Sequence, residues 1–438
     1  MKRIEMRRAA ALAATALLVA TGCDFNVTNP NSATEEEVAT TAEGLKAVAV
    51  GLQRSYASSV VETAIVFHGV TAREVVVNNT YYNQEVLELG GPTMSGAAGD
   101  VGGSFGRPIT ILRMSGLILD NADDITMNPG TRSGLVALAH LYRAMALGEL
   151  AKAFEQAPLE LEMNEQATFV PRAQVLTAAL DHLQQAEQTL NAQAVSSEFT
   201  STVLGTGFDM LNVLRLYRAR FQLMSGKYGE ALAAANTVSS TSVSYFRYDD
   251  TYRNPVYRQI VETKEYGARD GMGPPANVET GDKRLAFFLT PDAVVSKPDK
   301  KPMDKLTGFF ATASSPIPVF RPGEIALIKA EAYLRTNNLP AAVAEIDKVR
   351  TKKAAQDPLG LGADLPAYSG PVTAAALEAE IFRQRAAELY LAGTRWEDSR
   401  RLNQAGPPNS LDMRNRNFYP YPDQERLNNP NTPANPTM

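Results

Sequence analysis

The chain has 438 residues, of which 44% are hydrophobic and 21% are charged, a composition typical of a folded globular protein and not of a disordered one. Its formal net charge is −5, and it is −8 without the first 22 residues, which carry four basic residues and one glutamate. An acidic chain argues against nucleic acid as a partner, because binding to phosphates requires a basic surface.

The N-terminus has the pattern of an export signal. Four basic residues among the first eight positions precede an uncharged run over residues 9–20, and Thr21, Gly22 and Cys23 follow. The run is too short to span a bilayer, which takes about 20 residues. Cys23 is the only cysteine of the chain and stands where a lipoprotein signal peptidase cuts. We expect a signal peptide over residues 1–22, a lipid on Cys23 and a tether over residues 23–33; the alternative is an ordinary cleavage site beside a stray thiol.

Helical patterns dominate residues 34–438, which we expect to form a single domain. Thr34 and the three glutamates after it predict a helix start, and Leu45, Val48, Leu52 and Tyr56 continue at helical spacing. Further helices are predicted at residues 108–123, 135–154, 174–191 and 374–391, and helix–turn–helix pairs at residues 212–238 and 324–353.

Two segments break the helical pattern. Residues 78–107 are rich in Asn, Tyr and Gly, and residues 239–318 are rich in aromatic residues, Pro and Gly; the tail over residues 406–438 is also rich in Pro and Asn. Long irregular segments often carry function. The fold class predicted is mainly α, with tetratricopeptide-like helix pairs in a superhelical scaffold and irregular segments that form a ligand face.

Signatures of catalysis are weak throughout the chain. His68, His140 and His182 are too widely spaced for a helical zinc motif, so neither a metal nor another cofactor is expected. The glycine run before residue 107 lacks the Gly-Lys-Ser/Thr ending of a phosphate-binding loop, and no Gly-x-Ser-x-Gly elbow occurs. The neighbouring carboxylates Asp249 and Asp250 read as a solvated loop.

Several blocks of sequence are specific enough to indicate a family. They are LYRAMALGELAKAFEQAPLEL (141–161), ETGDKRLAFFL (279–289), FRPGEIALIKAEAYLRTNNLPAAVAEIDKVR (320–350), RQRAAELYLAGTRWEDSRR (383–401) and YPYPDQERLNNP (419–430). Together they resemble the SusD/RagB family of nutrient-uptake lipoproteins. The chain departs from the family pattern at Gln384, Ala392 and Tyr421.

This resemblance implies a function in nutrient capture. Proteins of this family bind glycans or other nutrients, are lipid-anchored in the outer membrane facing the cell exterior, and act as a lid on a TonB-dependent, SusC-like transporter. Two other functions stay open from the sequence: a helical-repeat scaffold for envelope proteins, and a lipoprotein glycoside hydrolase.

A ligand site is expected on the irregular segments. Sugar rings pack their CH faces on aromatic side chains, while their hydroxyls need paired donors and acceptors. These segments lack tryptophan, which leaves peptides or smaller nutrients open as ligands, and each tyrosine has packing in a loop as its alternative role. The candidates are Arg73, Tyr81, Tyr82, Asn83, Phe105, Arg107, Tyr252, Tyr257 and Tyr266.

Charged residues gather around the only tryptophan of the chain, Trp396. One reading makes Trp396 a platform for a sugar; the favoured reading makes the cluster a buried ion-pair network with Trp396 in the core. The charged members are Arg385, Glu388, Arg395, Asp398 and Arg401.

Overall fold

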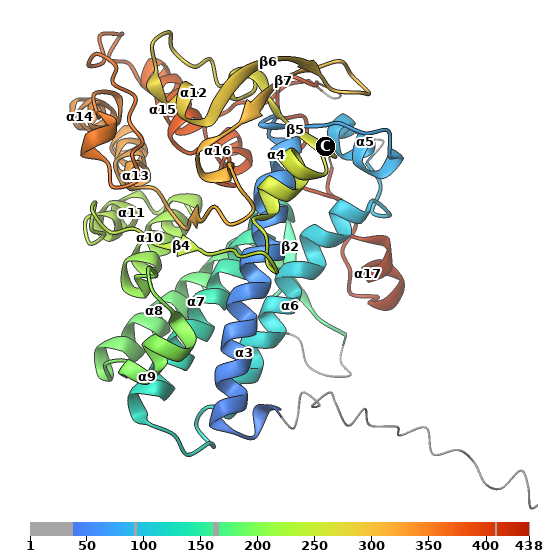
Figure 1. Ribbon diagram of the computed structural model, residues 1–438, viewed down its shortest axis with the longest axis vertical. Helices are drawn as coiled ribbons and strands as arrows, with labels where there is room; N and C mark the ends of the chain where they lie inside the picture. The colour runs from blue at the N-terminus through green and yellow to red at the C-terminus, as the bar shows by residue number, and fades with distance from the viewer. Residues whose placement is uncertain (1–37, 92–93, 161–165, 408–409, 438) are drawn as a thin grey trace, which may run out of the picture.

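The computed structural model describes residues 38–91, 94–160, 166–407 and 410–437. The signal peptide, Cys23, the tether and the helix start at Thr34 lie outside these residues and stay predictions. The described chain is mainly helical, as predicted, and its elements are shown in Figure 1.

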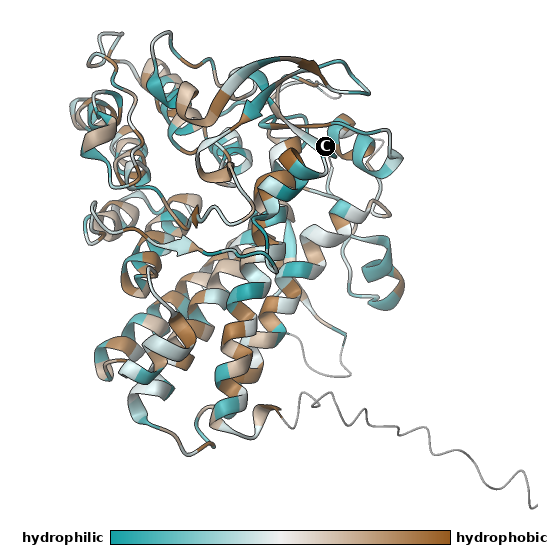
Figure 2. Ribbon diagram, viewed as in Figure 1, coloured by the Kyte–Doolittle hydropathy of each residue, from teal (hydrophilic) through white to brown (hydrophobic). Residues whose placement is uncertain are grey.

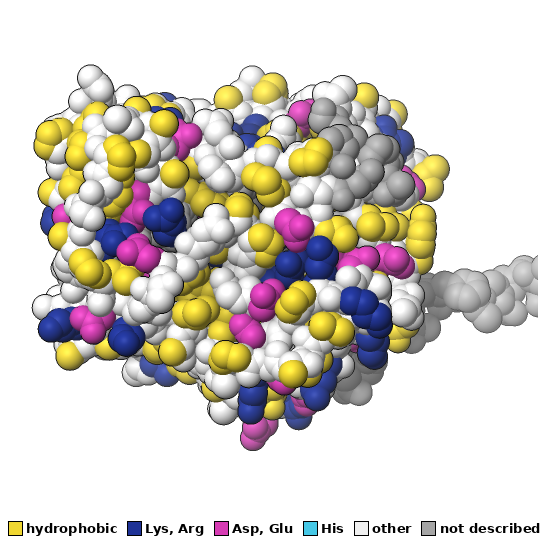
Figure 3. All heavy atoms as spheres, turned by 90° about the horizontal axis from the view of Figure 1, so that it is seen from above, with side chains coloured by type: hydrophobic (Ala, Val, Ile, Leu, Met, Phe, Trp, Pro, Cys, Tyr) yellow, Lys and Arg dark blue, Asp and Glu magenta, His cyan; other side chains and the backbone are white. Residues whose placement is uncertain are grey.

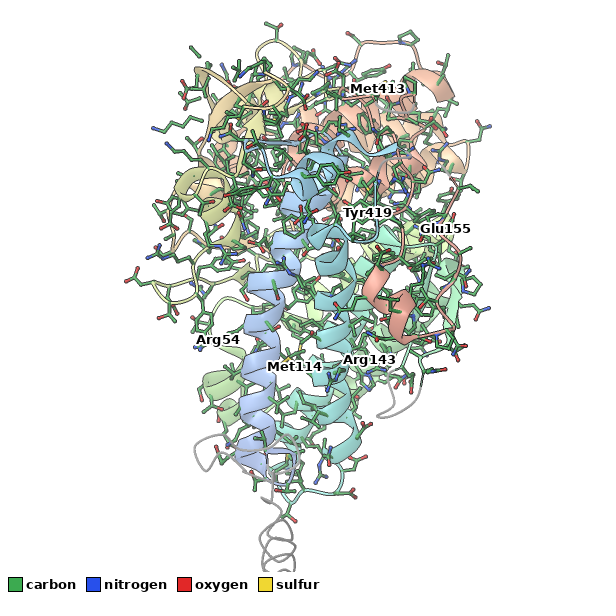
Figure 4. The ribbon with its side chains drawn as sticks, turned by 90° about the vertical axis from the view of Figure 1, so that its right-hand side faces the viewer. Arg54, Met114, Arg143, Glu155, Met413 and Tyr419 are labelled. Atoms are coloured by element: carbon green, nitrogen blue, oxygen red, sulfur yellow. The ribbon has the colours of Figure 1, made fainter. Side chains whose placement is uncertain are left out.

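Four long helices stand side by side in one half of the molecule (Figures 1 and 4). They are α3 (Ala42–Ser55), α6 (Gly99–Asn121), α7 (Pro129–Ala153) and α8 (Arg172–Ala192). Leu45, Leu52 and Tyr56 are buried, which confirms the predicted stripe, with Val48 half-buried beside it. Hydrophobic residues run along these helices in Figure 2.

The first helix changes its winding before it ends. After α3 the chain forms two π-helical turns, Tyr56–Val60 and Thr63–Phe67, and closes with α4 (His68–Thr71). Glu62 lies between the two turns with a side chain that is only 2% exposed. No helix within the described ranges combines the length and the hydrophobicity that a membrane span needs.

The segment over residues 78–107 is more ordered than its composition indicates. It contains α5 (Tyr82–Leu89), and the helix expected from Pro108 begins already at Gly99. Positions 101, 105, 108, 112 and 115 of α6 are all buried and follow helical spacing. Burial of this stripe outweighs the cost of about 1 kcal/mol that each glycine adds to a helix.

Helix α7 is surrounded by other elements. At Gly134 and Gly148 an added Cβ would come within 2.4 Å of the Phe199 ring and 2.2 Å of the Phe221 ring, so these glycines allow the close approach. The short helix α9 (Ser197–Phe199) and α10 (Met210–Met224) supply those rings.

Two predicted helix pairs are confirmed. The first is α10 with α11 (Tyr228–Ala235), and the second is α13 (Pro322–Arg335) with α14 (Leu339–Arg350). The superhelical, tetratricopeptide-like arrangement of such pairs stays a prediction. Three further helices follow: α15 (Ala374–Glu388), α16 (Arg395–Arg401) and the mostly hydrophilic α17 (Asp423–Asn428), the last within the tail that was expected to be irregular (Figure 2).

The segment over residues 239–318 forms short strands and turns. A four-stranded antiparallel sheet has the order β1 (Val75–Val77), β5 (Tyr266–Arg269), β7 (Pro302–Leu306) and β6 (Leu289–Val295). The helix α12 (Lys283–Phe288) precedes β6. Two smaller antiparallel pairs are β2 (Gln156–Pro158) with β3 (Phe169–Pro171), and β4 (Tyr245–Phe246) with β8 (Ile317–Pro318).

Buried ion pairs join α15 to the middle of the chain. The carboxylate of Glu388, which is 0% exposed, lies 3.1 Å from the Arg284 guanidinium and 2.6 Å from the Lys352 amine. Burial alone would raise the pKa of Glu388, but these two cations reverse the effect and hold it below its usual value. Arg284 also contacts Asp282 at 2.6 Å, and its guanidinium donates to Gln384 at 2.7 Å.

A second cluster of ion pairs surrounds Trp396, and the favoured reading of the C-terminal block is confirmed. Asp398 pairs with Arg385 at 2.8 Å and with Arg401 at 2.9 Å. Arg395 pairs with Glu74 at 3.3 Å. The Trp396 ring is 2% exposed and its Nε1 donates to the carbonyl of Arg416 at 3.0 Å, so it is not a platform open to solvent. Outside these buried clusters, basic and acidic side chains also lie next to one another on the face seen in Figure 3.

The three histidines are buried or half-buried. Nδ1 of His140 on α7 is 3.0 Å from Nδ1 of His182 on α8, and the two rings stack 5.1 Å apart. At this distance one nitrogen must donate and the other must accept, so both rings cannot be charged without repulsion. Burial, with the charge of nearby Arg143 (labelled in Figure 4), lowers the pKa of His140 to about 4 and that of His182 to about 3. Burial also lowers the pKa of His68 well below its usual value.

Replacing Glu388 with alanine should destabilise the protein strongly. Glu388→Ala leaves the Arg284 and Lys352 cations buried without their shared anion, a change that typically costs about 3–5 kcal/mol. Urea unfolding followed by far-ultraviolet circular dichroism measures the loss. The control is Arg253→Ala, which removes an exposed pair with Glu262 and should change stability by less than about 1 kcal/mol. Equal effects of the two substitutions would contradict the role given to the buried network.

All three histidines should stay neutral at about pH 5.5, where a free imidazole is about nine-tenths protonated. An unfolded chain takes up protons on these histidines below about pH 6.5, whereas the folded chain does not. The neutral histidines therefore favour the folded state above about pH 6.5, and this contribution to stability is lost as the pH falls toward 4. Imidazole signals in two-dimensional NMR, recorded between pH 7 and 4.5, test this directly. A midpoint near 6.5 for any of the three contradicts its described surroundings.

Candidate functional site

The structure divides the nine predicted site residues by exposure. Arg73, Phe105 and Tyr266 are buried; Arg107 and Tyr257 are half-buried. The other four are exposed: Tyr81, Tyr82, Asn83 and Tyr252. The exposed fractions of the three tyrosines are 63%, 71% and 40% in this order.

Arg73 connects distant parts of the main chain. Its φ angle is 70°, and its guanidinium donates to the carbonyls of Val70, Glu88, Ser410 and Met413, the last labelled in Figure 4. Burial lowers its pKa to about 10. These contacts leave its guanidinium in the interior and bound to the main chain, not turned toward a ligand.

The two buried aromatic candidates are part of the core. The Phe105 ring stacks on that of Phe169, with centroids 5.9 Å apart. The Tyr266 hydroxyl donates to Asp100 at 3.0 Å, and burial raises the pKa of that carboxyl to about 6.

Arg107 belongs to an ion-pair cluster around Glu62. Its guanidinium lies 2.8 Å from the Glu62 carboxylate and donates to the Ser59 carbonyl and the Thr63 hydroxyl of the two π-helical turns. Arg258, from a third π-helical turn at Tyr257–Glu262, reaches the same carboxylate at 2.5 Å. Glu62 therefore ties α6 and the aromatic-rich segment to the first helix.

The exposed tyrosines Tyr81 and Tyr82 form a ridge at the start of α5. The loop before them is fixed, because the side chains of Asn78 and Asn79 donate to the carbonyls of Lys264 and Glu265 at 3.0 Å. The two rings are open to solvent.

Tyr252 lies instead at a cavity of about 330 Å³. Aromatic side chains from three parts of the chain line it, and the rings of Tyr142 and Phe208 stack 6.3 Å apart. The aromatic lining residues are Tyr142, Phe208, Tyr245, Phe246, Tyr248 and Tyr252. A hollow of this size, lined by aromatic and aliphatic side chains together with polar groups, is a common form of small-molecule site.

Local hydrogen bonds hold the loops at the cavity mouth. Gly205 and Gly207 have φ angles of 73° and 78°, which lets the chain turn after a π-helical segment, Thr200–Leu204. Arg247 Nε donates to the Thr206 carbonyl at 2.9 Å and so fixes this turn against β4. An added Cβ on Gly207 would lie 2.4 Å from the Arg247 guanidinium.

The Asp249 carboxylate positions the Tyr252 ring. It accepts the backbone N–H groups of Tyr252 and Thr251, each at 2.8 Å, and these bonds lower the pKa of Asp249. The Arg54 guanidinium, from the last turn of α3, lies 4.7 Å from the centroid of the Tyr252 ring. Figure 4 shows Arg54 at the edge of the molecule beside α3.

A second hollow, of about 530 Å³, separates the start of α6 from α17. Its α6 side is formed by Gly99, Gly102, Gly106 and the predicted site residue Phe105, and an added Cβ on any of these glycines would meet no atom within 4 Å. Because Phe105 is only 5% exposed, this wall offers a ligand little besides main chain. The aromatic cavity is therefore the candidate site.

Sequence reasoning found one residue of this cavity and missed the others. Arg54 was not among the predicted site residues, and Tyr142 was placed only within the helix predicted at residues 135–154. An available signal was the alternation of aromatic and basic residues at Tyr245, Arg247 and Tyr248. Across the part of the chain that the structure describes, His, Asp and Glu side chains nowhere gather in groups of three or more that could hold a metal ion.

Comparison with known proteins shows which family part of the chain matches. The model of the SusD family matches residues 300–436. No curated protein matches the chain by sequence.

Solved structures share the fold over most of the chain. A SusD superfamily protein from Bacteroides thetaiotaomicron has a TM-score of 0.69 at 13% identity, covering 91% of this chain and 100% of that one. A putative sugar-binding protein from Bacteroides vulgatus has a TM-score of 0.66 at 17% identity, with coverages of 91% and 98%. A SusD-like carbohydrate-binding protein from the same species has a TM-score of 0.62 at 15% identity, with coverages of 83% and 84%.

The resemblance to the SusD/RagB family is thus confirmed: residues 300–436 carry the sequence pattern of the SusD family, and the described chain has the SusD-superfamily fold.

Proposed function

We propose that this chain is a nutrient-binding lipoprotein of the outer membrane, facing the cell exterior. It captures a carbohydrate or a related nutrient and delivers it to a TonB-dependent, SusC-like transporter, over which it acts as a lid. The observation that carries the binding role is the aromatic cavity at Tyr252, on a fold shared with proteins described as sugar-binding.

The chemistry of the cavity suits a sugar ring. Its tyrosine and phenylalanine rings offer apolar faces for CH groups, while Gln53, Thr206 and the arginines supply polar groups at the rim. The ridge of Tyr81, Tyr82 and Asn83 is a second surface on which a longer ligand could lie.

The cavity does not suit glycoside hydrolysis. That reaction needs two carboxyl groups about 5–10 Å apart across the bound sugar. Asp249 is the only carboxylate among the lining residues that the structure describes, so the second carboxyl group that the reaction needs is missing from this lining. We therefore propose binding and not catalysis.

Removing the Tyr252 ring should weaken ligand binding. Screening the purified protein against a glycan array identifies a ligand. Titration calorimetry then compares the affinity of Tyr252→Ala for this ligand with that of the wild type. A loss of about tenfold or more in affinity is expected, because an aromatic anchor in a binding pocket typically contributes at least 1–2 kcal/mol.

Matched variants locate the site and separate the functions. If Tyr81→Ala and Tyr82→Ala abolish binding while Tyr252→Ala has no effect, the ridge and not the cavity is the site. Recovery of the ligand unaltered after long incubation is expected of a binder, whereas its cleavage would show an enzyme. A protein that binds no array member yet pulls down a transporter would be a scaffold.

Replacing the lipid-bearing thiol should release the protein from the membrane. Cys23→Ser removes the acceptor sulfur, and without acyl chains the protein loses about 0.8 kcal/mol of anchoring for each buried CH2 group. Fractionation of cells expressing the variant should place it in the soluble fraction. Retention in the membrane pellet argues against the lipid anchor.

A further inference from the structure

The lining of the aromatic cavity carries more positive than negative charge. Of its described lining residues only three are charged: the two arginines Arg54 and Arg247, and Asp249. The two arginines are exposed, Arg54 on the last turn of α3 and Arg247 just after β4.

Neither arginine is neutralised by an ion pair. Among the described residues no carboxylate lies within 4.0 Å of the Arg54 or Arg247 guanidinium, although Asp249 lines the same cavity. The neighbouring arginines differ, because Arg253 pairs with Glu262, and Arg258 reaches Glu62 at 2.5 Å.

The guanidinium donors at the cavity are largely unused. Arg54 makes no hydrogen bond to described residues and instead lies over the Tyr252 ring, 4.7 Å from its centroid. Arg247 uses only Nε, toward the Thr206 carbonyl, and lies 5.9 Å from the centroid of the Tyr245 ring. Each guanidinium is thus oriented by an aromatic ring and keeps terminal N–H groups for a ligand.

Asp249 offsets only one of the two positive charges of the lining. Its carboxylate accepts two backbone N–H groups of its own loop, which lower its pKa and hold it in that turn. The lining therefore presents two guanidinium groups and one carboxylate, and Oδ1 of that carboxylate is bonded to its own loop. Guanidinium groups recognise carboxylates by paired, charge-assisted hydrogen bonds.

We infer that the ligand of this cavity carries carboxylate groups and is an acidic saccharide built from uronic acid units. The sugar ring packs on the tyrosines, and its carboxylate lies between Arg54 and Arg247. This inference rests on the proposed function, since it names the class of saccharide that the same cavity takes.

An oligogalacturonide of four units and its fully methyl-esterified form are the matched probes, because esterification removes the charge of each carboxyl group and adds only a methyl group. Titration calorimetry at low salt should show that the wild type binds the acid about ten- to hundredfold more tightly than the ester. The preference should shrink as salt is raised, since the arginines are exposed.

Variants of Arg54 test the source of the preference. In Arg54→Gln the ratio of the two Kd values should fall toward one, while Arg54→Lys, which keeps the charge but loses the fork, should retain part of it. Arg253→Gln is the control, because Arg253 is exposed, paired with Glu262 and outside the lining, so the ratio should not change. Circular dichroism melts confirm that each variant is folded.

The outcomes separate this inference from the proposed function. If the wild type binds neutral glycans but shows no preference for the acid over the ester, or if Arg54→Gln keeps the full preference, the inference is overturned and the proposed function stands. If the wild type binds no saccharide, acidic or neutral, the proposed function fails with it.

Discussion

The buried carboxylate of Glu388 is the constraint on which the C-terminal half of this protein depends. A charge removed from water is stable only if partners replace its hydration, and here they come from α12 and from the chain after α14. The same holds for Arg395, which finds Glu74 more than three hundred positions earlier in the chain. Helix α15 is therefore held against the middle of the chain, and α16 against its N-terminal part. Both Glu388 and Arg395 belong to residues 383–401, one of the sequence blocks that resemble the SusD/RagB family.

The candidate cavity follows from a similar meeting of distant segments. Its walls come from α3, α7 and the loops around residues 205 and 250, so no single stretch of sequence contains it. Each wall is fixed by its own hydrogen bonds: the Tyr248 hydroxyl donates to the Ala57 carbonyl at 2.9 Å, and Gln53 donates to the Val203 carbonyl at 2.8 Å. The rings at the mouth are thus set by the scaffold before any ligand arrives, which lowers the entropic cost of binding.

Much of the fold could be predicted from sequence, because periodic burial leaves a visible pattern. The stripe through Leu45, Leu52 and Tyr56, the two helix pairs and the burial of Trp396 all follow from residue type and spacing. The start of α6 could not be predicted in this way, since glycines mask a stripe through Val101 and Phe105 that only tertiary burial makes helical.

The residues of the candidate site were harder to predict from sequence than the fold. Nothing local distinguishes Arg73, whose guanidinium is buried among main-chain carbonyls, from Arg54, whose guanidinium is open to solvent. The difference lies in which carbonyls and carboxylates the fold brings within reach. Composition did identify the aromatic-rich segment, but it could not show that Tyr252 faces a cavity while Tyr266 faces the core.

The position of Trp396 gives the molecule a built-in optical signal. Its indole lies 4.5 Å from the Tyr419 ring and 5.1 Å from the His68 ring, where the C-terminal tail crosses the end of the first helix (Tyr419 is labelled in Figure 4). Tryptophan emission therefore reports whether these two ends of the fold are joined. Because Trp396 is the only tryptophan of the chain, its emission follows this assembly without any label.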